Sequence, residues 1–178
     1  MATVKSTVQR GFTLVEMVLT IVIIAIAGVG ISTALAFNLR HQADGFEYAK
    51  TAALAQAYME EILAKRYDEN TPLGGVPPCS PATTACSTVA NFDDGESRAA
   101  FDDVDDYDNL DDLPPLNLDG TARTEYARFR VQVQVAYASA AQVTALGLTD
   151  PTDAKVITVT ITPPAASPTS FSVTRTNF

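Results

Sequence analysis

The chain opens with a short polar segment and then reads Arg10-Gly11-Phe12-Thr13-Leu14-Val15-Glu16, after which Met17–Leu39 contains no formally charged residue. That uncharged run has 23 residues. As an α-helix it would extend roughly 35 Å, and the hydrocarbon core of a bilayer is about 30 Å thick. Lys5 and Arg10 precede the run, which favours a cytoplasmic amino end. The sequence therefore predicts one membrane-spanning helix near the amino terminus.

Three simpler explanations of this stretch compete: a cleaved secretory signal, a plain single-span anchor and a buried core helix. The run is longer than the apolar part of a usual signal peptide, and no clear small-residue cleavage site follows it. A plain anchor fits the composition. Glu16 is the feature that an anchor does not explain, because a carboxylate near the start of a membrane helix is costly unless it stays interfacial or finds a partner. Its position suggests a function, although it could also reach the membrane surface alone.

The combination of basic leader, Gly11, Phe12, Glu16 and apolar helix resembles the type IV prepilin processing site. In that family a leader is removed after the glycine, the new terminal phenylalanine is N-methylated, and the glutamate neutralises the terminal amine of a neighbouring subunit. The resemblance implies cleavage between Gly11 and Phe12 by the prepilin peptidase. It makes residues 1–11 the leader peptide and residues 12–40 the transmembrane and filament-core helix, with Glu16 as an assembly residue.

Composition narrows the classes of function. The 178 residues carry a formal charge of −9, so the chain is a poor candidate for nonspecific nucleic-acid binding. Its one histidine, His41, and its two cysteines leave little for a His/Cys metal site or for catalysis by a central histidine. We therefore expect neither an enzyme nor a nucleic-acid partner.

Residues 41–178 are predicted to form one α+β domain, with helix to about residue 67, loops over 70–123 and strands within 124–178. Period-two alternation of apolar and polar residues predicts strands at 127–137, 157–162 and 170–174, the last two joined by the proline-rich residues 163–168. The end of the helix carries one apolar stripe that the strands could cover, made of Leu54, Ala55, Tyr58, Met59, Ile62 and Leu63. The expected fold is a long amino-terminal helix packed on a small antiparallel sheet, as in type IV pilins.

Cys79 and Cys86 lie in the first part of the loop region. If the domain is exported, an oxidising compartment makes a disulfide the default state of this pair. A metal site made by two cysteines alone is the weaker alternative.

Residues 91–119 carry 11 of the 21 acidic residues of the chain. One interpretation is a solvated acidic loop anchored by Phe101, Val104 and Tyr107. The other is a calcium site, because hard cations prefer clustered oxygen ligands, although the spacing does not match an EF-hand loop. The candidate ligands are Asp102, Asp103, Asp105, Asp106 and Asp108. The string of residues 101–107 also resembles a segment of minor pilins of the mannose-sensitive haemagglutinin (MSHA) type.

The resemblance implies a structural, minor subunit of a type IV pilus that serves in adhesion or surface attachment. Its partners would be other pilin subunits, the prepilin peptidase and the inner-membrane assembly platform. The subunit would first reside in the inner membrane as a single-pass protein with a periplasmic carboxyl-terminal domain, and then in a filament on the cell surface. The alternatives are a minor pseudopilin of a type II secretion system and a membrane-anchored ligand-binding module. No cofactor is expected other than the calcium ion considered above.

Overall fold

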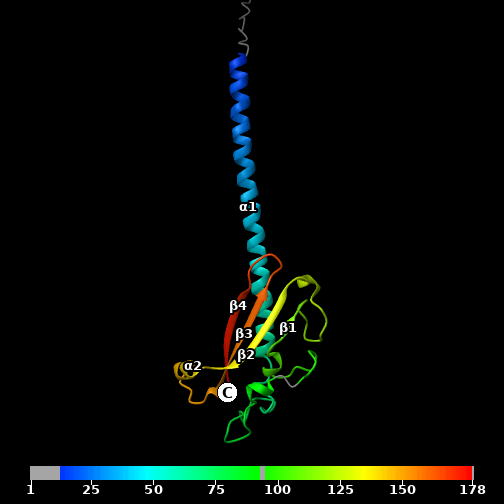
Figure 1. Cartoon of the computed structure of the whole chain (residues 1–178), viewed down its shortest axis with the longest axis vertical. Helices are drawn as coiled ribbons and strands as arrows, with labels where there is room; N and C mark the ends of the chain where they lie inside the picture. Colours follow the sequence, from blue (N-terminus) through cyan, green and yellow to red (C-terminus); the bar gives the residue numbers. More distant parts are fainter. Residues whose placement is uncertain (1–12, 93–94, 178) are drawn as a thin grey trace, which may run out of the picture. The chain divides into compact units, whose positions relative to one another are not determined.

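The structure is a computed structural model that describes residues 13–92 and 95–177, with the side chains of residues 38–44 excepted (Figure 1). The chain divides into two compact units, Met1–Phe46 and Glu47–Phe178, and each is described by itself below. The predicted cleavage site between Gly11 and Phe12 lies outside the described residues.

Helix α1 comprises Leu14–Leu63, which is 50 residues. The sequence predicted helix to about residue 67, but the helix ends four residues earlier. Arg175 contributes to this end, since its guanidinium donates a hydrogen bond of 2.6 Å to the carbonyl oxygen of Leu63. The last carbonyls of a helix have no partner within the helix, so a guanidinium at this place stabilises the end.

The second unit contains a four-stranded antiparallel sheet in the order β1-β2-β3-β4 (Figure 1). The strands are β1 Asp111–Asp112, β2 Arg130–Tyr137, β3 Ala154–Thr162 and β4 Thr169–Thr176. The three predicted strands correspond to β2, β3 and β4 with shifted ends, and the predicted link at 163–168 joins β3 to β4. Residues 127–129 are not strand, because the 3-10 helix η3 (Thr124–Tyr126) precedes them and the ladder starts at Arg130. Strand β3 pairs with both β2 and β4 and therefore lies between them.

Apolar side chains from the end of α1 and from one face of the sheet form the main core. The predicted helix stripe is buried at Leu54, Ala55, Tyr58 and Ile62, whereas Leu63 at the helix end is 38% exposed. The sheet contributes alternate residues, as the period of two predicted: Val131, Val133, Val135, Ile157, Val159 and Ile161 are all buried. The domain is therefore α+β, with a helix packed on an antiparallel sheet, and the predicted fold class is confirmed.

The segment between α1 and β2 is mostly loop, but it also builds part of the core. Phe92, Val104 and Tyr107 are buried within 1% of complete burial and belong to the main core cluster. Two short 3-10 helices position these residues. Phe92 directly follows η1 (Val89–Asn91), and Val104 directly precedes η2 (Asp105–Tyr107), which contains Tyr107. Part of the loop region is thus packed into the core of the domain.

The connection between β2 and β3 contains an element that the sequence analysis missed. Helix α2 (Ala140–Ala145) begins with a capping box, in which the Ser139 side chain accepts from the Gln142 backbone and the Gln142 side chain accepts from the Ser139 backbone. The 3-10 helix η4 (Pro151–Asp153) follows and leads into β3. Val143 of α2 is buried in a small second cluster.

Candidate functional site

The first candidate region is the amino-terminal part of α1. Leu14–Phe37 has 24 residues and is long and apolar enough to cross a membrane. Its large side chains are exposed, as Leu14 at 81% and Ile26 at 69% illustrate. The hydroxyl groups within it are satisfied by their own helix, since Thr20 donates to the Glu16 carbonyl at 2.7 Å and Ser32 to the Gly28 carbonyl at 2.8 Å. Such internal pairing is what an apolar surrounding requires of polar groups.

Glu16 lies in the first turn of α1. The Thr13 hydroxyl oxygen accepts a hydrogen bond of 3.3 Å from the Glu16 backbone N–H, and a threonine followed three residues later by glutamate is an amino-terminal capping pattern. The position also places the carboxylate at the positive end of the helix dipole. Within residues 13–92 and 95–177 the structure shows no ion pair for Glu16. Its predicted role in assembly therefore stays a prediction.

Cys79 and Cys86 form a disulfide with 5.0 Å between their Cα atoms. Both sulfurs are thus bonded to each other and are not free to bind a metal. The Asn177 amide donates a hydrogen bond of 2.8 Å to the Cys79 carbonyl oxygen, so the disulfide loop is tied to the residue that follows β4.

The five predicted calcium ligands do not form one cluster in the structure, and their carboxyl groups make different contacts. Asp103 Oδ1 accepts backbone hydrogen bonds from Asp105 at 2.6 Å and Asp106 at 3.3 Å, and Asp106 Oδ2 accepts from the backbones of Asp102 at 2.7 Å and Asp103 at 3.0 Å. These carboxylates hold a tight turn. Burial, and next the charge of Asp106, raises the pKa of Asp103 to about 6.

Asp108 lies beyond this turn and belongs to the edge of the sheet. Its Oδ1 accepts a hydrogen bond of 2.9 Å from the Val135 backbone, and the Leu110 carbonyl accepts one of 3.0 Å from the Val133 backbone. Together these acceptors extend the pairing of β2 beyond the two-residue strand β1, so part of the edge of β2 is already occupied.

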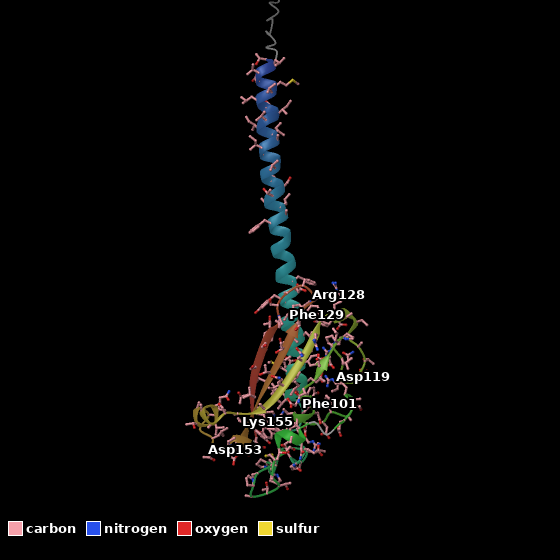
Figure 2. All side chains as sticks on the ribbon, in the orientation of Figure 1. Phe101, Asp119, Arg128, Phe129, Asp153 and Lys155 are labelled. Atoms are coloured by element: carbon pink, nitrogen blue, oxygen red, sulfur yellow. A yellow bond between two sulfur atoms is a disulfide. The ribbon has the colours of Figure 1, made fainter. Side chains whose placement is uncertain are left out.

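Asp105 faces the interior, where it meets Lys155. Both residues are buried, as is Asp68. The Lys155 Nζ donates to Asp105 Oδ2 at 2.7 Å, to Asp68 Oδ2 at 3.0 Å and to the Tyr67 carbonyl at 2.8 Å. Figure 2 labels Lys155 at the start of β3, at the end of the sheet where the loops gather. We call Lys155, Asp68 and Asp105 the buried triad.

The two carboxyls of the buried triad differ in their protonation. Burial raises the pKa of Asp105 to about 8 despite the nearby Lys155. Burial also raises the pKa of Asp68, but Lys155 and the backbone N–H groups of Asn70 and Ser87 outweigh burial and hold it below its usual range. The triad therefore contains one carboxyl that favours its proton and one that favours ionisation.

One trio of carboxylates does come together at the surface. Oxygens of Glu69, Asp102 and Asp103 lie within 4.8 Å of one another, which is close enough to share a cation. Arg66 already neutralises part of this negative charge, since its guanidinium forms ion pairs with Glu69 at 2.9 Å and with Asp102. The trio contains only two of the five predicted ligands. Calcium binding stays a prediction, and the arrangement favours Arg66 as the counter-charge.

A second ion pair that no sequence pattern predicted joins the buried Arg98 to the half-buried Glu61. Arg98 is 8% exposed, and its guanidinium carbon lies 4.8 Å from the centre of the Tyr107 ring, whose hydroxyl donates to Glu61 at 2.8 Å. Arg98 is also the one basic residue of the acidic segment 91–119, and this isolation was a usable signal. Lys155 carried another signal, because it shares its alternation with the inward-facing Ile157 and Val159.

Comparison with known families supports the reading of the amino terminus. A family model described as a prokaryotic N-terminal methylation motif matches residues 7–32, a range that includes Gly11, Phe12 and Glu16. Neither the search of curated proteins nor the search of solved structures gave a match. The motif supports a type IV pilin-like protein and indicates a structural subunit rather than an enzyme. It implies processing by prepilin peptidase and assembly with other pilins, and the apolar helix fits a membrane-anchored pilin.

Proposed function

We propose that this chain is a minor subunit of a type IV pilus, cleaved between Gly11 and Phe12, methylated at Phe12 and assembled into a filament for surface attachment. The observation that carries the proposal is the methylation motif joined directly to the exposed apolar segment Leu14–Phe37. Before assembly the subunit would span the inner membrane once, with residues 41–178 in the periplasm. After assembly it would be part of the cell-surface filament.

The exposed segment needs an apolar surrounding. Burial of apolar surface is favourable by roughly 25 cal/mol per Å², so a helix with side chains such as Leu14, Ile24 and Ile26 mostly exposed strongly favours lipid or other apolar helices over water. A bilayer and the core of a filament both satisfy this need. In the filament, the cationic amine of a neighbouring Phe12 would be the counter-charge for Glu16, because a buried carboxylate without a partner is strongly disfavoured.

Within the pilin class, the string of residues 101–107 favours a minor pilin of the MSHA type. A minor pseudopilin of a type II secretion system is the second candidate, because the methylation motif and the helix-on-sheet fold suit both. Copurification separates the two: a pilus subunit is recovered in filaments sheared from cells, whereas a pseudopilin is recovered with the secretion complex in the envelope.

The proposal is tested by the amino-terminal peptide of protein purified from membranes. In cells that contain prepilin peptidase, mass spectrometry should find N-methylated Phe12 as the first residue, and in cells without the enzyme it should find the uncleaved leader. Gly11→Val, which adds a branched side chain at the cut, should retain the leader in both, whereas Thr7→Val within the leader should be processed normally. An intact leader in peptidase-containing cells would overturn the proposal.

A further inference from the structure

The buried triad is a small reactive arrangement that the proposed function does not use. Lys155 and Asp68 are 0% exposed and Asp105 is 2% exposed. Two carboxylates with one ammonium group would leave an uncompensated charge in an apolar interior, which is strongly disfavoured. The triad therefore favours a state with an additional proton, and the Lys155 nitrogen lies within hydrogen-bond distance of both carboxyl groups.

The amine is placed against the carboxyl group of Asp105 rather than against one of its oxygens alone. Lys155 Nζ lies 2.7 Å from Oδ1 and 2.7 Å from Oδ2, so the carboxyl carbon between them is also within reach of the nitrogen. Oδ1 accepts no hydrogen bond of good geometry among the described residues. On its other side the same nitrogen contacts Asp68 Oδ2 at 3.0 Å, and the Ser87 backbone holds that oxygen at 2.9 Å.

We propose that Lys155 and Asp105 become joined by an intramolecular amide bond between Nζ and Cγ, with Asp68 as the proton acceptor. The inference is independent of the proposed function, since it uses residues of the second unit alone.

The reaction needs no oxidant, reductant or outside reagent. The Lys155 ammonium gives one proton to the Asp68 carboxylate, and the neutral amine attacks the carboxyl carbon of protonated Asp105. The tetrahedral intermediate expels one oxygen as hydroxide, which takes a proton from Asp68 and leaves as water. Asp68 then takes the second proton from the nitrogen and ends protonated. One N–C bond forms, one C–O bond breaks, and one water molecule is released.

The surroundings favour this condensation over hydrolysis. Three aromatic rings enclose the nitrogen, with Nζ 4.3 Å from the centre of the Tyr67 ring, 5.1 Å from Phe92 and 5.4 Å from Tyr137. A dry site promotes proton transfer from ammonium to carboxylate, because neutral groups are favoured in low dielectric. The raised pKa of Asp105 keeps it in the protonated form that can be attacked, and the lowered pKa of Asp68 keeps it able to accept a proton.

A tryptic peptide map of the full processed chain, purified in detergent, tests the bond directly. Without the bond, cleavage after lysine and arginine releases peptides 99–123 and 131–155 separately. With the bond, Lys155 resists cleavage, and peptide 99–123 is recovered joined to peptide 131–175 with the mass of one water molecule missing. Fragmentation should place the link at Asp105 and Lys155. Recovery of only the separate peptides, or a link at Asp68, would overturn the proposal.

Variants separate the reacting groups from the helper. Asp105→Ala and Lys155→Met should abolish the linked species, and the matched exposed variant Asp111→Ala should leave it intact. Asp68→Asn keeps both reacting groups and removes the proton acceptor, so the linked fraction should fall from nearly complete to a minor part. An undiminished linked fraction in Asp68→Asn would overturn the role given to Asp68. The wild-type map decides the bond even if a variant fails to fold.

Discussion

Leu14–Phe37 and the acidic segment 91–119 handle charge in opposite ways. The first has 24 residues, of which Glu16, near one end, is the one with an ionisable side chain. The second carries 11 carboxylates and one arginine, and several of these charges point into the core of the domain. One segment exposes apolar surface, whereas the other buries ionisable groups.

The difference lies in where each segment finds its stabilising partners. Asp105 pairs with Lys155, which is 50 residues away, and Asp112 accepts from Tyr58, which is 54 residues away. These partners are within the same unit, so folding of that unit alone supplies the acidic segment with its partners. The apolar segment has exposed side chains in the described structure, so it needs an apolar surrounding from outside the chain, which in the proposed function is a bilayer or other subunits. Substitutions should therefore affect assembly in the first region and stability in the second.

The largest expected effect follows from Glu16→Ala. Cleavage after Gly11 should continue, but incorporation into filaments should fall by more than about tenfold, because a neighbouring terminal amine would be buried without its counter-charge. Immunoblots of sheared filaments and of membranes measure both steps. Glu60→Ala, an exposed acid on the soluble part of α1, is the matched control and should assemble normally. Equal incorporation of both variants would contradict the pairing of Glu16 with a neighbouring terminal amine.

Lys155→Met should produce the largest loss of stability. It removes the nitrogen that contacts both Asp68 and Asp105, and with it any bond between Lys155 and Asp105, so two carboxyl groups are left buried without their partner and the free energy of unfolding should fall by about 3–5 kcal/mol. Urea unfolding followed by tyrosine fluorescence measures it, since the chain has six tyrosines and no tryptophan. Arg130→Met breaks the exposed pair with Asp111 and should change the free energy of unfolding far less, because solvent screens an exposed pair.

A companion variant separates charge from packing at the triad. Adding Asp68→Asn and Asp105→Asn to Lys155→Met removes the uncompensated carboxyls and should recover part of the lost stability. If Lys155→Met alone lowered the free energy of unfolding no more than Arg130→Met does, the contrast between buried and exposed pairs would be contradicted.

Tyr58→Phe tests a hydrogen-bonded contact between α1 and the acidic segment. The hydroxyl donates to Asp112 Oδ2 at 2.7 Å and accepts from the Leu116 backbone at 2.9 Å, and its loss leaves buried Asp112 and half-buried Leu116 each short of a partner. We expect a loss of about 1–3 kcal/mol in the free energy of unfolding. Tyr48→Phe, at a tyrosine that is 64% exposed, should change it by less than about 0.5 kcal/mol. Similar values for the two variants would contradict the assigned contact.

Asp103→Asn should change the pH dependence of stability. The folded pKa of about 6 lies above the ordinary value of 3.8, so between these values the folded chain holds a proton that the unfolded chain has lost. The free energy of unfolding therefore falls as pH rises through this window, and the loss is complete above it. The amide removes the contribution of Asp103 to that fall, whereas Asp105, with a pKa raised to about 8, keeps its own contribution. The amide can still accept from the Asp105 backbone, so stability at neutral pH should rise on the order of 1 kcal/mol, with solvent screening allowed for.

Urea titrations at a series of pH values measure the slope. Asp119→Asn is the control, because hydrogen bonds from Thr121 hold the pKa of that exposed carboxyl below its usual range, and this variant should not flatten the fall. An unchanged slope in Asp103→Asn would show that Asp103 does not contribute to the fall.

Local periodicity explains why the main elements could be predicted. The strand alternation of β2, β3 and β4 and the helix stripe from Leu54 to Ile62 are short-range patterns, and burial follows them closely. The ends of these elements depend on distant groups, as Arg175 does at the end of α1, and no local pattern encodes them. Helix α2 is a different case, because its Ser139–Gln142 capping box was visible in the sequence but its apolar content is too low to draw attention.

The candidate sites divide along the same line. The motif around Gly11, Phe12 and Glu16 is contiguous, so the sequence alone contains all of it. The buried triad joins residues 50 and 87 positions apart, and its existence depends on how the loops fold over the end of the sheet. Clustered aspartates in the sequence suggested a calcium site. The sequence does not show that the fold brings two cationic side chains against these aspartates, Arg66 against Asp102 and Lys155 against Asp105.

Calcium gives the smallest expected effect and tests this last point. A cation that competes with Arg66 for Glu69 and Asp102 would bind weakly, and at a concentration equal to its Kd it would add about 0.4 kcal/mol to the free energy of unfolding. Thermal melting at millimolar calcium should therefore shift Tm little, with magnesium as the control ion. Arg66→Gln removes the competing guanidinium and should enlarge the calcium shift. A large shift in the unaltered chain would show that calcium displaces Arg66, and the surface of the acidic segment would then depend on an outside partner, as the apolar segment does.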